Sequence, residues 1–191
     1  MSTESPEVGE ISTDGQFRWD GQAWSPLARG HREPTSWTLP LRWITAVYLG
    51  VSALVQLVTN ILFVTQAALE RSIRSSNPQL SDDQVQSSAA LGYTLGWVLV
   101  AVIVVVTLVL AVGSLRGWRW VFWADLVVLV IGSVQIFTNA FALTSPATQT
   151  LPMPAVVLDL VLSVLALALL VWFILAAARF GPWAMRRPGV A

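Results

Sequence analysis

Two acidic residues, Asp125 and Asp159, lie inside long apolar stretches of the sequence. Ionisable side chains are expensive to bury in a membrane segment and commonly mark an ion or proton pathway. The chain has one histidine, His31, and contains neither cysteine nor lysine. This composition excludes thiolate metal sites, cysteine nucleophiles and lysine Schiff bases. Among the side chains that commonly carry chemistry, only the carboxylates remain. We therefore expect no enzyme, no cofactor and no metal site.

The elements that must position these carboxylates are apolar helices. The chain has 191 residues, of which 55% are hydrophobic and only 12% are charged. Four stretches reach the roughly 20 residues needed to cross a bilayer. They run over residues 41–67, 89–113, 120–143 and 154–180. In lipid, a single spanning segment can satisfy the hydrogen-bonding groups of its backbone only by forming a helix. We therefore predict an all-α membrane protein, a four-transmembrane-helix bundle.

The arginines predict how these spans are oriented. All of them except Arg71 and Arg74 fall at the termini or in the short connection between the second and third spans. The positive-inside rule then places both termini in the cytoplasm of a multi-pass bacterial plasma-membrane protein. Tryptophans gather near the same boundary, where we expect them to be interface anchors. They are Trp37, Trp43, Trp118, Trp120, Trp123 and Trp183.

A set of polar side chains recurs near the opposite ends of three spans. It consists of Gln56 and Asn60 in the first, Gln135 and Asn139 in the third, and Asp159 in the fourth. At a rise of 1.5 Å per residue they lie roughly 3 to 12 Å outward of the membrane midplane. The favoured interpretation is interhelical hydrogen bonding, worth about 0.6 kcal/mol per contact. The other is a hydrated vestibule that binds an ion or a small polar molecule.

Asp125 lies near the other end of the third span, close to Arg116 and Arg119. Residues three or four apart share a helix face. We therefore expect an interfacial ion pair among these three residues.

The connection between the first two spans carries helix-boundary signals. Asn77-Pro78 should break any helix that continues from the first span. Ser81 followed by Gln84 is typical of a capping box, with Asp82 and Asp83 at the positive helix end. The second long helix should therefore start near Asp82.

The polar leader contains "DGQFRWDGQAW", in which residues 14–26 predict a short cytoplasmic β-hairpin. A type I′ turn at Asp20-Gly21 would pair Trp19 with Gln22, Arg18 with Ala23 and Phe17 with Trp24. Alternation then puts the aromatic side chains on one face. Because an isolated hairpin is marginal in water, that face must dock on lipid, on the helical bundle or on a partner. The candidate partner-binding residues are Phe17, Trp19, Asp20, Gly21 and Trp24.

The remaining segments flank the hairpin and the helical bundle. Residues 1–13 read as a disordered N-terminus, residues 27–40 as a juxtamembrane linker, and residues 181–191 as a cytoplasmic tail. His31 would be an exposed linker residue, because a lone histidine without cysteine or a second histidine cannot make a metal site.

The segment "DGQFRWDGQAWSPL" resembles the short DG-x-x-x-WDG-x-x-W-x-P element found near the termini of many actinobacterial membrane proteins. The following "REPTSWTLPLRW" resembles the juxtamembrane stretch of four-span proteins from that group. The short element is fairly specific but brief, and the wider similarity rests on hydrophobic helices. The resemblance implies an actinobacterial plasma-membrane protein of a family without an assigned activity, so it supplies no catalytic residues.

Two functions stay open from the sequence. The first is a non-enzymatic interaction or scaffolding protein that uses the hairpin to bind a cytosolic or membrane protein. The alternative is a small transporter or channel component that uses the polar cluster around Asp159. Either would have the lipid bilayer as a partner, and nothing in the sequence favours nucleic-acid binding or predicts an oligomeric state.

Overall fold

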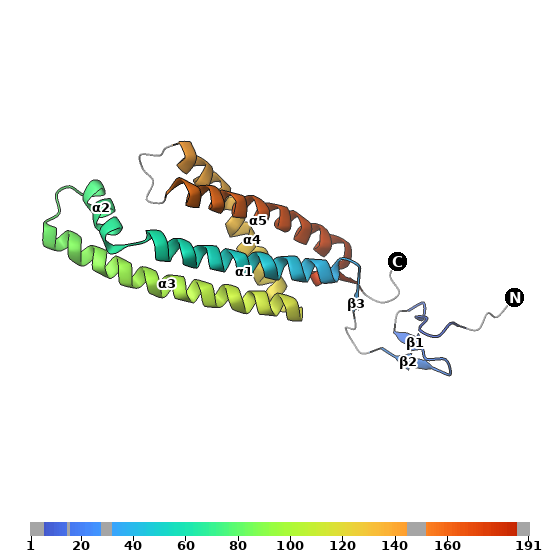
Figure 1. The fold of residues 1–191 in the computed structure, drawn as a ribbon. Coiled ribbons are helices and arrows are strands. Elements are labelled where there is room, and N and C mark those ends of the chain that lie inside the picture. Colours follow the sequence, from blue (N-terminus) through green and yellow to red (C-terminus); the bar gives the residue numbers. More distant parts are fainter. Residues whose placement is uncertain (1–5, 15, 28–31, 145–151, 187–191) are drawn as a thin grey trace. The chain divides into compact units, whose positions relative to one another are not determined.

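The computed structural model describes residues 6–14, 16–27, 32–144 and 152–186. The chain divides into two compact units: a terminal unit within residues 1–42 and 173–191, and a helical unit of residues 43–172. In chain order the elements are β1 (Phe17–Trp19), β2 (Trp24–Pro26), β3 (Glu33–Pro34), α1 (Thr38–Phe63), α2 (Gln66–Ser76), α3 (Asp82–Arg116), α4 (Arg119–Thr144), α5 (Met153–Phe180), the 3₁₀ helix η2 (Pro182–Ala184) and β4 (Met185–Arg186) (Figure 1).

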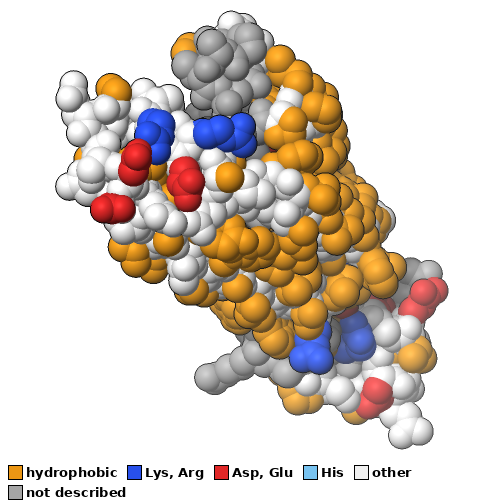
Figure 2. Space-filling view, turned by 60° about the vertical axis from the view of Figure 1, so that its left-hand side comes forward, with side chains coloured by type: hydrophobic (Ala, Val, Ile, Leu, Met, Phe, Trp, Pro, Cys, Tyr) orange, Lys and Arg blue, Asp and Glu red, His pale blue; other side chains and the backbone are white. Residues whose placement is uncertain are grey.

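Four of these helices, α1, α3, α4 and α5, are long and apolar enough to cross a membrane. Large apolar side chains stay exposed along them, for example Leu95 at 66% and Phe137 at 76%. Figure 2 shows hydrophobic side chains over most of the visible helical surface. Such a surface is unusual for a protein in water and is the expected outer face of a helix in lipid. The predicted fold class is confirmed, and the helices fit a multi-pass membrane protein.

The segment after the first span is a separate helix that the sequence analysis missed. The first span was expected to continue to residue 67, but α1 ends at Phe63 and α2 begins at Gln66. Thr65 has an extended backbone (φ −110°, ψ 155°), and its hydroxyl accepts a hydrogen bond from the Ala68 N–H at 3.2 Å. A threonine N-cap of this kind starts a new helix. The apolar stretch 41–67 is therefore divided between the end of α1 and the start of α2.

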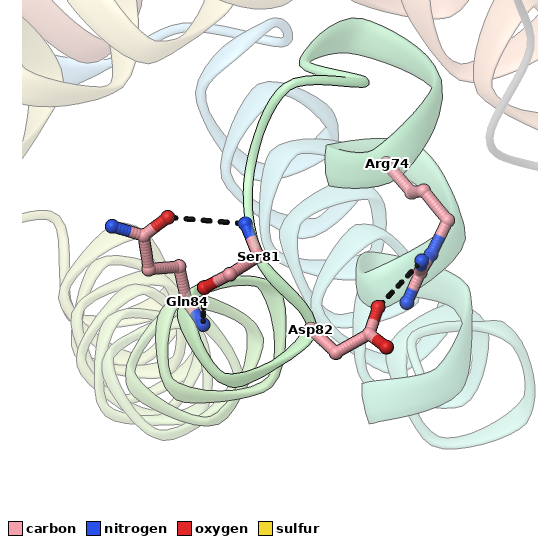
Figure 3. Close-up of polar contacts among 4 residues, drawn as sticks. All are labelled: Arg74, Ser81, Asp82 and Gln84. Carbon is pink, nitrogen blue, oxygen red and sulfur yellow. Dashed lines mark hydrogen bonds and ion pairs between the residues drawn. The ribbon is translucent and has the colours of Figure 1, made fainter.

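The start of α3 is the capping box that the sequence predicts (Figure 3). The Ser81 N–H donates to Gln84 Oε1 at 3.1 Å, and the Gln84 N–H donates to Ser81 Oγ at 3.4 Å. The helix begins at Asp82, as expected. Arg74 of α2 forms an ion pair with Asp82 at 2.8 Å, which links the end of α2 to the start of α3.

A tight turn joins α3 to α4. Gly117 caps α3 in the left-handed conformation (φ 69°, ψ 33°), and its N–H points to the carbonyls of Gly113 and Ser114. Glycine adopts this conformation without the steric cost that a Cβ brings. Gly113 is also in close contact with α4: a Cβ added there would lie 2.5 Å from Val121 Cγ2. The short connection makes α3 and α4 antiparallel neighbours.

The terminal unit contains two small antiparallel pairings, β1 with β2 and β3 with β4. The second pairing joins two segments, 27–40 and 181–191, that were expected to be a linker and a tail. The sequence did not lead us to expect the pairing of Glu33–Pro34 with Met185–Arg186.

Candidate functional site

The helical unit contains a cavity of about 370 Å³ between α1, α3, α4 and α5. Its walls combine aliphatic side chains with nine polar ones. The polar lining residues are Tyr48, Ser52, Gln56, Thr59, Asn60, Thr107, Gln135, Asp159 and Ser163. Apolar walls that carry convergent polar groups are the usual form of a small-molecule site.

The cavity gathers most of the polar cluster that the sequence predicts. Gln56, Asn60, Gln135 and Asp159 all line it. Asn139 is not among the lining residues, and its side-chain amide donates to Ser163 Oγ at 3.2 Å, a contact between α4 and α5. The two interpretations of the cluster therefore apply to different residues: Asn139 makes an interhelical hydrogen bond, while the other four face a cavity.

The predicted cluster leaves out five polar lining residues, Tyr48, Ser52, Thr59, Thr107 and Ser163. On α1 a signal was present, because Tyr48, Ser52, Gln56 and Asn60 repeat at intervals of four residues. Residues four apart share one helix face, so the stripe could have been extended from the two amides. The Tyr48 hydroxyl donates to the Leu162 carbonyl oxygen at 3.4 Å and fixes the ring between α1 and α5.

The Asp159 carboxylate is the chemically distinctive group in the cavity. Among the described residues it has no ion-pair or hydrogen-bond partner, and no basic side chain lines the cavity with it. Ser163, one turn later, donates instead to the Asp159 backbone carbonyl at 2.8 Å. A carboxylate, amides and hydroxyls surrounded by apolar walls can accept hydrogen bonds from a solute and favour a positive charge.

The predicted ion pair of Asp125 with Arg116 and Arg119 is wrong. Asp125 is fully buried, and Ser114 Oγ donates to its Oδ2 at 2.6 Å. The described residues include no salt bridge to it, and the Arg116 guanidinium lies 5.7 Å from the ring centre of Trp118. Asp125 follows Arg119 by six residues, which is about 240° around a helix. The spacing therefore points the two side chains to different faces.

The leader hairpin forms, but with another register than predicted. β1 and β2 pair Trp19 with Trp24, Arg18 with Ser25 and Phe17 with Pro26. The loop is longer than two residues because Asp20 organises it: its Oδ1 accepts from the N–H groups of Gln22 and Ala23, both at 2.8 Å. The register differs from the expected one by two residues. An even shift preserves the faces, so Phe17, Trp19 and Trp24 still share one.

The segment before β1 also pairs with it through a bridge between Ile11 and Arg18, and we call residues 9–12 together with β1 and β2 the terminal sheet. The Gly9 N–H donates to the Trp19 carbonyl at 2.8 Å, and the Ser12 N–H donates to the Phe17 carbonyl at 3.0 Å. The predicted disorder of residues 1–13 is therefore wrong for residues 9–12. Asp14 stabilises the turn before β1 in the same way that Asp20 stabilises the turn between β1 and β2. The Asp14 Oδ1 accepts a hydrogen bond from the Gln16 N–H at 3.1 Å.

The two faces of the terminal sheet differ in chemistry. Arg18 lies opposite Ile11 and Ser25, and its guanidinium forms an ion pair with Glu33 of β3 at 2.5 Å. The aromatic side chains lie on the other face. There the rings of Trp19 and Trp24 lie 5.5 Å apart between centroids, tilted by 59° to each other, and Trp24 is 40% exposed.

Residues 32–38 and 181–186 form a second feature of the terminal unit, here called the clasp. The Ala184 carbonyl accepts hydrogen bonds from the hydroxyls of Thr35 at 2.8 Å and Thr38 at 2.9 Å. Trp183 is fully buried against Phe173, at 5.8 Å between ring centroids. Trp183 was expected to be an interface anchor, so its burial corrects that prediction. His31 lies outside the described residues.

Breaking the Asp20 turn should disorder the terminal sheet. Hydrogen bonds from the Ala23 and Gln22 N–H groups and from the Ser25 hydroxyl lower the pKa of Asp20 below its ordinary value. This stabilisation is present above the unfolded pKa, near 3.9, and is lost as the pH falls through the lower folded pKa. We expect Asp20→Ala to abolish the Trp19–Trp24 exciton couplet in circular dichroism at neutral pH, and acid to abolish it in the unmodified protein.

Asp83→Asn is the control for this prediction, because Asp83 lies on α3 in the helical unit. It should leave the couplet and its acid midpoint unchanged. A couplet that survives Asp20→Ala at full amplitude would show that the carboxylate does not hold the turn.

No protein-family model matches the chain, and the searches of curated proteins and of solved structures also found no match.

Proposed function

We propose that the protein binds a small cation or polar solute in its intramembrane cavity, as a transporter or channel component. The observation that carries this proposal is the Asp159 carboxylate, which lines a cavity of about 370 Å³ without an ion-pair partner among the described residues. A volume of this size suits a small molecule, since ligand cavities typically measure roughly 300–1,000 Å³.

The lining favours a positive or donor-rich solute over an anion. Gln56 and Gln135 contribute amides, and Tyr48 and Ser52 contribute hydroxyls, while no arginine or histidine is among the lining residues. Low-dielectric walls strengthen the attraction between a carboxylate and a cation and also the repulsion of an anion. An ammonium group near Asp159 with hydrogen bonds to the amides would satisfy this set of groups.

Asp159→Asn tests this function. The substitution keeps the size of the side chain and removes its charge, so binding and flux of a cationic solute should fall roughly tenfold or more, as expected for a lost charged hydrogen bond. The measurement is uptake of ethylammonium, guanidinium, Na⁺ and K⁺ into proteoliposomes that contain the full chain.

Asp82→Asn provides a matched control, because Asp82 is exposed at the start of α3 and does not line the cavity. It should leave every flux unchanged. Equal flux in the unmodified protein and in Asp159→Asn, or no flux of any solute above that of empty liposomes in either protein, would contradict the proposal.

The orientation of the chain is part of the proposal. The arginines near the chain termini and in the connection between α3 and α4 support cytoplasmic termini through the positive-inside rule. Within the terminal unit, the clasp joins the start of α1 to the end of α5, which agrees with an even number of spans. A single cysteine at position 22 should then be inaccessible to reagents added outside intact cells.

An interaction role for the leader is a second candidate function. The observation that favours it is the exposure of aromatic side chains on one face of the terminal sheet, while Arg18 on the other face is held by Glu33. Scaffolding through this face requires no catalysis and is independent of the cavity. The resemblance to an actinobacterial family remains a prediction.

A further inference from the structure

We infer that the aromatic face of the terminal sheet binds a basic segment, rich in arginine or lysine, of a partner protein. This inference rests on the interaction role proposed for the leader and adds the chemical class of the partner. It concerns residues that the cavity does not use.

The aromatic face is available because the sheet is attached through its opposite face. Arg18 reaches from that opposite face to Glu33, so the sheet is fixed to β3 and through β3 to β4. Phe17 and Trp24 remain 36% and 40% exposed. Exposed aromatic side chains grouped on one face mark an interaction site more often than a solvated surface.

The segment that forms the terminal sheet is acidic. Residues 6–26 carry four carboxylates and a single arginine. The carboxylates, all on exposed residues, belong to Glu7, Glu10, Asp14 and Asp20. The charge of Arg18 is already matched by Glu33. Hydrogen bonds within the two turns also keep the pKa of Asp14 and of Asp20 below the ordinary value, which maintains their negative charge.

Exposed aromatic rings on an acidic sheet are complementary to guanidinium and ammonium groups. A cation over the face of a tryptophan is attracted by the ring quadrupole, and nearby carboxylates provide charge-assisted hydrogen bonds and long-range attraction. The same charges oppose docking on the anionic headgroups of a cytoplasmic leaflet. A basic peptide is therefore favoured over the membrane surface as the occupant.

The experiment measures peptide binding to the full chain in phosphatidylcholine nanodiscs. The probes are fluorescent peptides in which glycine alternates with arginine, glutamate or serine. We expect the arginine peptide to bind and the other two not to bind. Trp24→Ala should weaken binding about three- to fivefold, the range of an exposed cation–π contact. Glu7→Gln combined with Glu10→Gln should weaken it and reduce its salt dependence.

Two variants separate recognition from general charge attraction and from misfolding. Trp120→Ala removes an exposed tryptophan of the helical unit and should leave the affinity unchanged. Trp24→Phe retains an aromatic ring and should keep most of the affinity. Unchanged affinity in Trp24→Ala would overturn the inference.

The remaining outcomes distinguish the partner class from the interaction role itself. Equal, Trp24-dependent binding of the arginine, glutamate and serine peptides would overturn the basic class and leave the interaction role standing. Trp24-dependent binding to phosphatidylglycerol vesicles in place of any peptide would make the face a lipid contact. If neither peptides nor vesicles bind the sheet, both the inference and the interaction role are wrong, and the cavity function is unaffected.

Discussion

Replacing Trp183 with alanine is expected to lower the free energy of unfolding by about 3 to 5 kcal/mol, the range for removing a fully packed large aromatic side chain. The indole is 0% exposed, packs edge-on against Phe173 and has the Arg42 guanidinium 5.9 Å from its ring centre. Removing it empties the centre of the clasp and exposes the contacts that hold β3 to β4. The midpoint of thermal unfolding in detergent, followed by circular dichroism, measures the loss.

The backbone conformation of Trp183 predicts that glycine and alanine substitutions there will rank in stability opposite to their usual order. Trp183 has φ 59° and ψ 23°, a left-handed conformation that costs a non-glycine residue roughly 1–2 kcal/mol. Burial of the ring compensates for this strain. Trp183→Gly loses the same ring but relieves the strain, so it should be more stable than Trp183→Ala. Glycine elsewhere is usually less stable than alanine by about 0.5–1 kcal/mol.

Trp120→Ala is the matched control for this series, since Trp120 is 56% exposed at the start of α4. Its loss should change stability by no more than about 0.5 kcal/mol. A midpoint for Trp183→Ala equal to that of the control would show that the clasp does not contribute to the folded state.

The helices and the capping box could be predicted because their causes are local in sequence. A run of more than twenty apolar residues leaves the backbone no other membrane-spanning form than a helix. Ser81 and Gln84 form their reciprocal hydrogen bonds within one turn. The polar cavity was also partly predictable, because helical rise and periodicity place Gln56, Asn60, Gln135 and Asp159 at one level.

The clasp could not be predicted because its contacts join residues about 150 positions apart. The Thr35 hydroxyl and the Ala184 carbonyl are 149 residues apart in sequence. No local pattern indicates that two segments of two residues each will pair. The left-handed backbone at Trp183 is also contrary to the preference of tryptophan, and only the surrounding tertiary contacts maintain it.

Two errors arose from applying a correct rule at the wrong spacing. Asp-Gly favours a two-residue turn, but the Asp20 carboxylate accepts two N–H groups and opens a longer loop. Asp125 was predicted to form an ion pair with Arg119, which is six residues away and therefore lies on a different face of the helix. Its actual partner, Ser114, lies on the preceding helix and becomes a neighbour only through the turn at Gly117.

Gly113→Ala is expected to destabilise the protein by about 1 to 3 kcal/mol, the usual cost of overpacking a tight core. An added Cβ would lie 2.5 Å from Val121 Cγ2 and 3.0 Å from Trp118 Cε3. Val121 is 0% exposed and β-branched, so it cannot rotate away freely. The methyl group must therefore push α3 and α4 apart where Ser114 contacts Asp125 at 2.6 Å.

Gly96→Ala is the matched control on the same helix, because nothing lies within 4 Å of an added Cβ there. Its expected effect is neutral or stabilising by up to about 1 kcal/mol, from the lower backbone entropy of alanine. A double-mutant cycle with Val121→Ala isolates the clash: alanine at position 113 should cost less in that background, because Cγ2 is absent. If Gly113→Ala and Gly96→Ala unfold at the same temperature, or if the cycle shows no coupling, the close contact of α3 with α4 is not the reason for glycine at position 113.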